Sequence, residues 1–418
     1  MVDLVMDKQQ LDAAGKGVPA GWVQCKLGDA LTLQRGFDLP QRLRKEGSIP
    51  IISSSGESGW HNKAIISPPG IVTGRYGTIG EVFFIDRPFW PLNTTLYVRE
   101  FNGITPFYAY FLLKTVDFQS HSGKSGVPGV NRNDVHQENI LLPPIKEQIA
   151  ISTTLSNVDE LISALERLLS KKQAIKTATM QQLLTGKTRL PQFALRDDGT
   201  AKGYKKSELG DIPEDWDNST YGQVFSFLAT STNARSDLSD TGECGYIHYG
   251  DIHTKWNNNL NLENSSVPRI SSDLVSSSFI KDGDLIMADA SEDYAGIGKS
   301  IEIQGVRDNI IVAGLHTYLL RDMNNIFVNG FRGYLHCIRA VKANIDRLAT
   351  GMKVFGVSKN NLKTIPIPVP PKEEQTAIAA ILSDMDKEIQ TLQQRLDKTR
   401  QLKQGMMQEL LTGKTRLI

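Results

Sequence analysis

Two glycine-lysine-threonine triplets are the first residues whose types could carry out chemistry. Gly186–Thr188 and Gly413–Thr415 match the end of a phosphate-binding loop, in which an earlier glycine completes the loop and a helix follows it. Both triplets lack that glycine, and each follows a predicted helix. The triplets therefore do not predict nucleotide binding.

The proline pairs at 143–144 and 370–371 resemble the strand end at which adenine methyltransferases hold the target amino group. Leu142 and Val369 occupy the position where that chemistry needs an Asn or Asp side chain. No glycine-rich loop for an adenosyl cofactor follows a predicted strand. The sequence therefore predicts no methyltransferase site.

Cys244, His248 and His253 are close enough in sequence to suggest a metal site. No fourth ligand stands at a suitable spacing, and we interpret Tyr246, His248 and Gly250 as alternating along one face of a strand. We therefore expect no metal at this segment.

The acidic residues Asp284, Asp289, Glu292 and Asp293 could hold magnesium for a nuclease. No lysine stands at the usual nearby strand spacing, and carboxylates can equally accept hydrogen bonds from cytosine amino groups. An enzyme that acts on DNA through Asp284, Asp289 and Glu292 stays open as an alternative. Magnesium-dependent cleavage by the purified chain alone would support it.

Length and composition favour a multidomain cytoplasmic protein. The 418 residues are 40% hydrophobic and 22% charged, with a net charge of +1, and three scattered cysteines predict neither disulfides nor a zinc site. We find no long apolar run or export signal, and expect a soluble chain without membrane contact. A net charge of +1 does not by itself indicate nucleic-acid binding, but it is compatible with local basic patches.

A long internal repeat is the strongest signal in the sequence. Residues 142–190 match residues 369–417 without a gap, and about half of the paired positions are identical, including the closing LLTGKTRL. The opening GVPAGW (17–22) also resembles DIPEDW (211–216), and a predicted strand follows each. Between these landmarks the halves diverge. The order is variable globule, constant helix, variable globule, constant helix.

Each constant segment predicts one helix of about 40 residues, which starts after the proline pair and ends before Gly186 or Gly413. Apolar residues alternate at spacings of four and three, as in a coiled coil, and we expect the two helices to pack on each other in antiparallel orientation. The alternative is that each packs only on its own globule. The predicted seam residues, which also belong to the expected partner-docking region, are Ile151, Leu155, Val158, Ile162, Leu165, Leu169, Ile378, Leu382, Met385, Ile389, Leu392 and Leu396.

Glycine-containing polar loops in the variable globules hold side chains that suit bases and phosphates. In the first globule they cover 53–63, 74–80, 91–95 and 121–132, and in the second 248–256, 288–300, 314–317 and 351–359. Each loop alone could be an ordinary turn, but together they favour DNA contact. The candidate DNA-binding residues are Ser54, Ser55, Glu57, His61, Arg75, Tyr76, Thr78, Asn93, Thr94, Lys124, Arg132, Asp251, His253, Lys255, Ser291, Glu292, Tyr294, His316, Thr317, Lys353 and Lys359.

Over nearly its whole length the chain resembles the specificity subunits of type I restriction-modification enzymes. The segments GRYGTIGEVFFIDRPFWPLNTTLYV (74–98), ADASEDYAGIGKS (288–300) and AGLHTYLLRD (313–322) are similar to target-recognition domains of that family. PPxxEQ and LLTGKTRL are similar to the start and end of its conserved helices. The stretch 1–16 has no role that we can assign.

The resemblance implies a DNA-binding chain without catalysis, acting in defence against phage. Each globule would read one half of a bipartite double-stranded DNA target. The helices would set the spacer and dock two methyltransferase subunits, and two motor-nuclease subunits would join through those. S-adenosylmethionine, ATP and magnesium would belong to the partners, with no cofactor in this chain. The alternatives are a specificity chain for a fused restriction-methylation enzyme and a coiled-coil scaffold without DNA preference.

The expected fold class is α/β (α+β), with two target-recognition domains separated by two long antiparallel coiled-coil helices and related by pseudo-twofold symmetry. The predicted segments are an N-terminal extension (1–16), the first target-recognition domain (17–142), the central helix (143–190), a linker (191–211), the second target-recognition domain (212–368) and the C-terminal helix (369–418).

Overall fold

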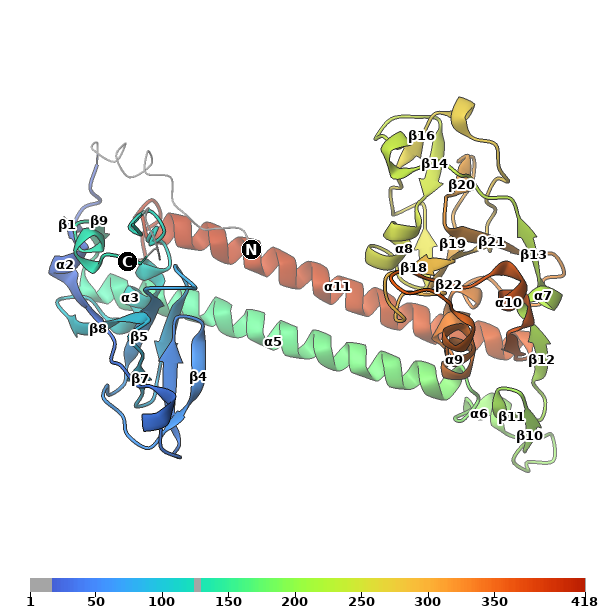
Figure 1. The fold of residues 1–418 in the computed structure, drawn as a ribbon, viewed down its shortest axis with the longest axis horizontal. Coiled ribbons are helices and arrows are strands. Elements are labelled where there is room, and N and C mark those ends of the chain that lie inside the picture. The colour runs from blue at the N-terminus through green and yellow to red at the C-terminus, as the bar shows by residue number, and fades with distance from the viewer. Residues whose placement is uncertain (1–16, 124–128, 418) are drawn as a thin grey trace. The chain divides into compact units, whose positions relative to one another are not determined.

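The computed structural model describes residues 17–123 and 129–417. The chain forms two compact units, one within Met1–Arg167 and Gln393–Ile418 and the other within Leu168–Leu392. Each unit contains one globule together with a part of each long helix (Figure 1). The two long helices therefore belong to both units.

The long helices are α5 (Ile145–Leu183) and α11 (Lys372–Leu410), and each has 39 residues. Each begins just after its proline pair. Shortly after each helix, Gly186 (φ +67°) and Gly413 (φ +70°) take the left-handed backbone that ends a helix. The predicted helices and their glycine ends are confirmed.

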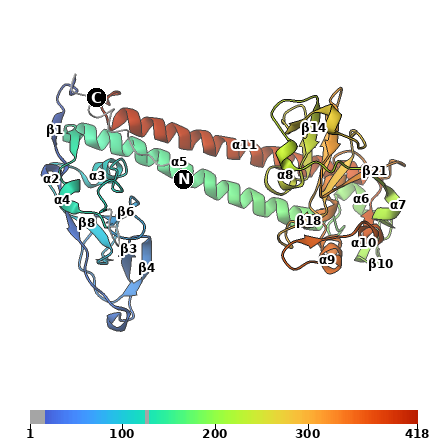
Figure 2. The ribbon, with the colours of Figure 1, turned by 45° about the horizontal axis from the view of Figure 1, so that its top comes forward.

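In the first unit the start of α5 lies beside the end of α11 (Figure 2). Lys403 pairs with Asp159 at 2.5 Å, and Arg400 pairs with Glu166 at 2.6 Å. Later residues of α5 thus face earlier residues of α11, so the two segments are antiparallel.

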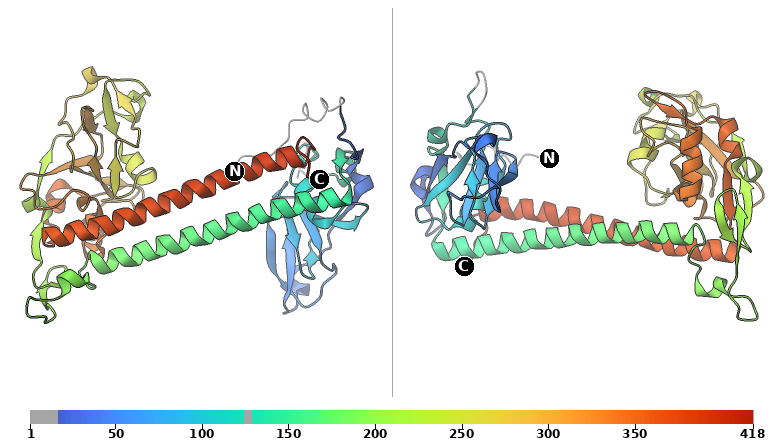
Figure 3. Two further views of the ribbon diagram at one scale, coloured as in Figure 1. Left: turned by 180° about the vertical axis from the view of Figure 1, so that it is seen from behind. Right: turned by 60° about the horizontal axis from the view of Figure 1, so that its bottom comes forward.

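In the second unit the end of α5 packs beside the start of α11 in the same way (Figure 3). Lys172 pairs with Glu388 at 2.7 Å, and Lys176 pairs with Asp386. In both units the seam is buried or half-buried, so the predicted antiparallel coiled coil is confirmed and the alternative of two separate helices is wrong. Its buried members are Ile151, Leu155, Leu165, Leu169, Ile378, Leu382 and Leu396.

The first globule is closed by strands from its two ends, because β1 (Val23–Lys26) pairs antiparallel with β9 (Asn139–Leu142). Between them lie a four-stranded and a three-stranded sheet. In sheet order these are β2 (Leu31–Arg35), β8 (Thr95–Phe101), β5 (Gly70–Gly74) and β6 (Val82–Ile85), then β4 (Gly56–His61), β3 (Ile49–Ser53) and β7 (Trp90–Pro91). The helices are α2 (Leu27–Ala30), α3 (Pro106–Leu113) and α4 (Arg132–Val135).

The second globule is closed in the same way, by β12 (Asp217–Thr220) and β23 (Pro366–Val369). Its larger sheets are, in order, β13 (Phe225–Leu228), β21 (Thr317–Asp322), β17 (Leu285–Ala288), β19 (Ser300–Gln304) and β15 (Asn259–Asn261), then β16 (Arg269–Ile270), β14 (Cys244–Ile247) and β20 (Ile311–Ala313). A small sheet joins β18 (Ala290–Ser291) and β22 (Phe355–Gly356). Helices are α7 (Tyr221–Val224), α8 (Tyr249–Thr254), α9 (Arg339–Leu348) and α10 (Lys359–Thr364).

Before this globule, the predicted linker contains α6 (Pro191–Ala194) and leads into a hairpin of β10 (Tyr204–Ser207) and β11 (Gly210–Pro213). One detail of the sequence interpretation is wrong. Strand β14 stops at Ile247, and His248 accepts a hydrogen bond from the backbone of Gly250 as the N-cap of α8. His248 and Gly250 therefore do not share a strand face with Tyr246.

The two globules share one topology although their sequences diverge. The order β2-β8-β5-β6 corresponds to β13-β21-β17-β19, with β15 added at the edge. In each three-stranded sheet the middle strand has one parallel and one antiparallel neighbour. The mixed α/β fold and the internal duplication are therefore confirmed, and the duplication extends to the backbones of the variable globules.

A buried joint in the first unit explains most of the repeated sequence motifs. Glu147, near the start of α5, accepts hydrogen bonds from the Nε1 of Trp22 (2.9 Å) and from Arg416 (2.7 and 2.8 Å). The guanidinium of Arg416 also lies over the Trp22 ring. One carboxylate thereby ties the beginning of the globule, the start of α5 and the chain just after α11.

The second unit repeats this joint with the equivalent residues. Glu374 accepts from Trp216 (2.8 Å) and twice from Arg189 (2.6 Å each). Gly186 lies so close to Pro213 that an added Cβ would stand 2.3 Å from its Cγ. The glycine and arginine of LLTGKTRL are thus needed for packing.

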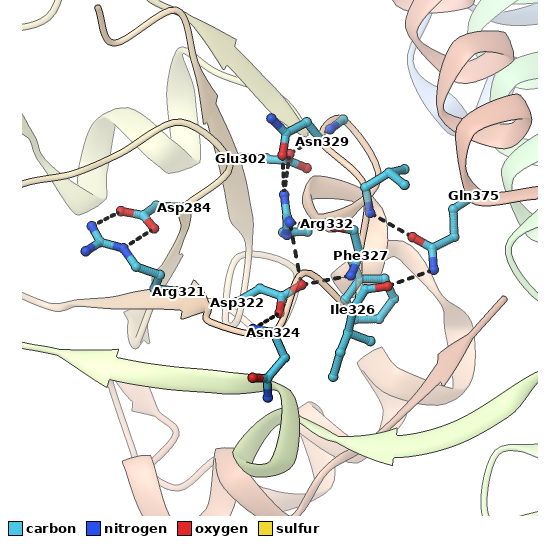
Figure 4. A network of polar contacts seen from close by, with 12 residues as sticks. Asp284, Glu302, Arg321, Asp322, Asn324, Ile326, Phe327, Asn329, Arg332 and Gln375 are labelled. Atoms are coloured by element: carbon cyan, nitrogen blue, oxygen red, sulfur yellow. Dashed lines mark hydrogen bonds and ion pairs between the residues drawn. The ribbon is translucent and has the colours of Figure 1, made fainter. Parts of the chain in front are cut away.

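The glutamine of PPxxEQ connects each helix to its own globule. Gln375 accepts from the backbone of Val328 (2.9 Å) and donates to Ile326 (3.1 Å) and Pro370 (2.8 Å), as Figure 4 shows in part. In the first unit Gln148 bonds in the same way to the backbones of Thr105, Gly103 and Pro143. Each motif therefore orients a globule on the start of the following helix.

Beside Gln375, a buried ionic network stabilises the second globule (Figure 4). Arg332 donates to Asn329 (2.8 Å) and lies against the carboxylates of Glu302 (3.3 Å) and Asp322 (3.5 Å). Burial raises the pKa of Glu302, and the facing Arg332 opposes this shift. Because buried charges need partners, this cluster is a structural requirement of the fold.

Replacing Glu147 with glutamine is expected to loosen the first joint. The variant Glu147→Gln keeps the size of the side chain but removes the charge that faces Arg416, and we expect a loss of about 2–3 kcal/mol in unfolding free energy. Glu166→Gln is the matched control, because its partner Arg400 bridges the same two helices at the surface. Chemical denaturation of both variants measures the difference, and equal losses would contradict the buried role of Glu147.

The pH dependence of that difference is fixed by the direction of the pKa shift. The hydrogen bond from Arg416 is the main cause that holds the pKa of Glu147 below its usual range. A lowered pKa stabilises the fold above the unfolded value of about 4.3 and loses this effect as the pH falls through the folded value. The gap between the native chain and Glu147→Gln should therefore be constant near neutrality and shrink below about pH 4.

Candidate nucleic-acid interface

In the first globule, three of the predicted loops and the described ends of the fourth converge, and we call this group the first loop cluster. The backbone N–H groups of Arg75 and Tyr76 donate to the carbonyl of Thr94 at 2.8 and 3.2 Å. Val130, near the end of the fourth loop, donates its backbone N–H to the carbonyl of Arg75 at 2.9 Å. Ser54 completes the group, since its Oγ would lie 3.3 Å from a Cβ added at Gly77.

The four predicted loops of the second globule converge in the same manner, as the second loop cluster. The carbonyl of His316 accepts a hydrogen bond from the backbone N–H of Asp289 (3.1 Å), and the backbone N–H of Val357 donates to the carbonyl of Asp289 (3.0 Å). The ring nitrogen Nε2 of His253 lies 3.0 Å from the carbonyl oxygen of Ala290. Four chain segments that are far apart in sequence thus form one surface region.

The two clusters have equivalent backbones. Gly74 pairs with Thr95 across β5 and β8, and Ala288 pairs with Thr317 across β17 and β21. Thr95 Oγ1 donates to the carbonyl of Leu92 (2.7 Å), as Thr317 Oγ1 donates to that of Gly314 (2.5 Å). The same frame thus carries a different set of side chains in each globule.

Four of the candidate DNA-binding residues are buried and have structural roles. His61 and Ser291 are each 6% exposed, and Thr317 (3%) is the turn residue just described. Asp251 is 1% exposed and pairs with Lys255 (3.0 Å) and Arg235 (3.3 Å). Base edges cannot reach these side chains in this conformation, so we withdraw them as contacts.

The other candidates keep exposed or half-exposed side chains, with one exception, Lys124, which lies outside the described residues. Glu57 pairs with Arg87 at 2.6 Å, and Asn93 donates to Asp38. Thr94 and His253 are half-buried, and the Oγ1 of Thr94 and the Nδ1 of His253 are shielded from solvent. The remaining accessible candidates are Ser54, Ser55, Arg75, Tyr76, Thr78, Arg132, Lys255, Glu292, Tyr294, His316, Lys353 and Lys359. They stay predictions.

Two aromatic residues of the second loop cluster, Tyr249 and Phe355, are not among the DNA-binding candidates predicted from the sequence. Tyr249 lies edge-on to His316, with ring centres 5.5 Å apart, and Phe355 packs on Tyr294 at 4.0 Å. Both lie inside loops that the sequence singled out, and an aromatic residue in a glycine-containing loop is the signal that could have found them. In the first cluster, Arg75 lies 4.4 Å above the ring of Tyr76.

Two of the acidic residues considered for magnesium, Asp284 and Asp289, face basic side chains. Both carboxylate oxygens of Asp284 accept from Arg321, at 2.8 and 2.6 Å, as Figure 4 shows. Asp289 faces His316, whose Nδ1 lies 3.5 Å from Oδ1. Among residues 17–123 and 129–417, no group of three or more His, Cys, Asp or Glu side chains is placed to hold a metal ion.

The model of the type I restriction modification DNA specificity domain matches residues 19–177 and 213–400, one copy for each half of the repeat. These matches cover more than half of the chain. The chain belongs to this family. It therefore carries the DNA-specificity role of a type I restriction-modification system and is not a catalytic subunit.

Known proteins agree with this membership. A type I restriction enzyme MjaVIII specificity subunit from Methanocaldococcus jannaschii is 26% identical over 96% of this chain and 95% of its own length. The same organism's putative MjaX specificity subunit is 26% identical over 78% of this chain and 72% of its own length.

Two solved structures share the fold. One is an S subunit of a type I system from M. genitalium, with a TM-score of 0.61, 16% identity and coverage of 95% of this chain and 97% of that one. The other comes from a study of complex assembly in a type I R-M system, with a TM-score of 0.53, 15% identity and coverage of 94% and 98%. In the described part of this chain, no helix is both long and apolar enough to cross a membrane.

Removing the Arg75 guanidinium should weaken DNA binding. Arg75→Ala is expected to reduce the affinity for duplex DNA by about 1–3 kcal/mol if the side chain contacts a base, or to lower the salt slope by about one if it contacts a phosphate. Arg99→Ala is the matched control, since Arg99 is an exposed arginine of β8 beyond the loop cluster. Titrations at several salt concentrations measure both effects, and equal behaviour of the two variants would exclude this surface.

Proposed function

We propose that each globule reads one half of a bipartite double-stranded DNA target through its loop cluster. The observation that carries this proposal is the repeated backbone frame with unlike side chains, Arg75 and Thr94 in one globule and Asp289 and His316 in the other. A single frame with exchangeable side chains can recognise two different short sequences, because base identity is read by side-chain donors and acceptors.

We further propose that the helices fix the spacer between the half-sites and dock two methyltransferase subunits, through which two motor-nuclease subunits join. Exposed apolar side chains on α5 support a docking role, since Leu168 and Ile175 are 39% and 40% exposed in the second unit and Leu161 is 41% exposed in the first. Large apolar groups on a helix surface favour burial against a partner.

In this proposal the cofactors belong to the partners. S-adenosylmethionine would serve the methyltransferase subunits, and ATP and magnesium the motor-nuclease subunits. The chain would act in the cytoplasm, where the DNA is. The occupied carboxylates of Asp284 and Asp289 agree with a division of labour in which this chain supplies recognition only.

Modified-base sequencing tests the proposed function. DNA from cells that express this chain with its methyltransferase subunit should carry N6-methyladenine in one motif, with two short defined halves around a fixed undefined gap. Cells with the methyltransferase subunit alone are the control and should lack this motif. A contiguous motif, or methylation independent of the chain, would contradict two readers on one frame.

Lengthening both helices should lengthen the gap. Duplicating Glu166–Lys172 in α5 and Gln390–Leu396 in α11 adds one heptad to each helix and preserves the seam. The added length is about 10 Å, or about three base-pair rises. A seven-residue insertion in the turn of the β10–β11 hairpin is the control, because it leaves both helices unchanged. An unchanged gap in the heptad variant would contradict the spacer role.

A further inference from the structure

Two positions of the shared frame are equivalent in the globules but differ in chemistry. In the first globule Arg75 follows β5 and Thr94 precedes β8. In the second globule Asp289 follows β17 and His316 precedes β21. In each globule the first of these donates its backbone N–H to the carbonyl of the second. The frame therefore places these two side chains next to each other at the end of a strand pair.

His316 has an uncommon backbone conformation. Its φ is +58°, in the left-handed region that non-glycine residues rarely adopt. Such conformations persist where the surroundings enforce them and are common at functional sites. Here Thr317 anchors the turn, and the Tyr249 ring supports the imidazole from one side.

The imidazole is presented outward in one orientation. Its Nδ1 lies 3.5 Å from Oδ1 of Asp289, while 51% of the side chain is exposed. Because Nδ1 is the ring nitrogen that lies beside the carboxylate, Nε2 is the one left for a ligand. A carboxylate that fixes one imidazole nitrogen so that the other can act is a general way to position histidine.

We propose that His316 reads one base of the half-site recognised by the second globule through Nε2, and that Asp289 positions its ring. This inference rests on the proposed function. A protonated imidazole donates from Nε2 to N7 or O6 of guanine, and a neutral ring with its proton on Nδ1 accepts from the amino group of adenine or cytosine. The ligand is therefore the edge of a single base in duplex DNA.

The variant His316→Asn removes the imidazole with little strain, because asparagine tolerates the left-handed backbone. We expect methylation at sites that differ from the motif at one base of one half to rise about tenfold relative to the intact motif. The other half should keep its base preferences. The matched variant of the first globule is Arg75→Ala, at the position equivalent to Asp289, and it should change only the opposite half, which makes each half the control for the other.

Asp289 is tested as a positioning residue by two variants. Asp289→Asn can still accept from Nδ1 and should retain most of the discrimination. Asp289→Ala cannot accept and should relax the same base position as His316→Asn. A merely structural role would lower methylation at all sites equally without changing the preference at one base.

Every readout comes from modified-base sequencing of DNA from cells that express the complete complex. Relaxation at one base of one half by His316→Asn, shared with Asp289→Ala, supports the inference. An unchanged motif, an equal loss at all sites, or relaxation in the half altered by Arg75→Ala overturns it. If the native chain directs no bipartite motif, the proposed function itself fails, so the two failures are distinguishable.

Discussion

The buried hydrogen bonds between a glutamate, an arginine and a tryptophan determine how each unit is held together. Glu147 or Glu374 stands at a helix start, Arg416 or Arg189 follows the end of the other helix, and the tryptophan opens the globule. A buried carboxylate is stable only when charged and hydrogen-bonding partners surround it. All three segments must therefore meet for any of them to be satisfied, and this requirement explains why the helix ends repeat while the loops do not.

Given that anchor, the globules can vary in sequence without losing their frame. The strand order and the hydrogen bonds from Arg75 to Thr94 and from Asp289 to His316 are made by backbone atoms, which do not depend on side-chain identity. A buried threonine, Thr95 or Thr317, fixes the turn in both globules. Other loop positions, such as Arg75 and His316, keep exposed or half-exposed side chains and are free to change.

This division explains what could be predicted from the sequence. The long helices were predicted because apolar spacing and glycine ends are properties of nearby residues. The loops with candidate residues were also found, since glycine and polar residues mark them locally. The burial of Asp251 was not predictable, because it depends on Arg235 and Lys255 after α8 has formed. The common topology of the globules could not be predicted for a related reason. Strands distant in sequence pair through backbone atoms, so the two globules need not share side chains that an alignment could detect.

The positions of the charged residues explain how a chain with a near-neutral net charge can recognise DNA. Of 47 basic and 46 acidic residues, several pair with each other between α5 and α11 or in the buried joints, where they set register and orientation. Phosphate attraction scales with unpaired basic charge, whereas base recognition depends on a few well-placed donors and acceptors. At equivalent frame positions the chain carries Arg75 in one globule and Asp289 in the other, opposite charges that no uniform phosphate-binding surface would select. That contrast agrees with the proposal that the two globules read different sequences.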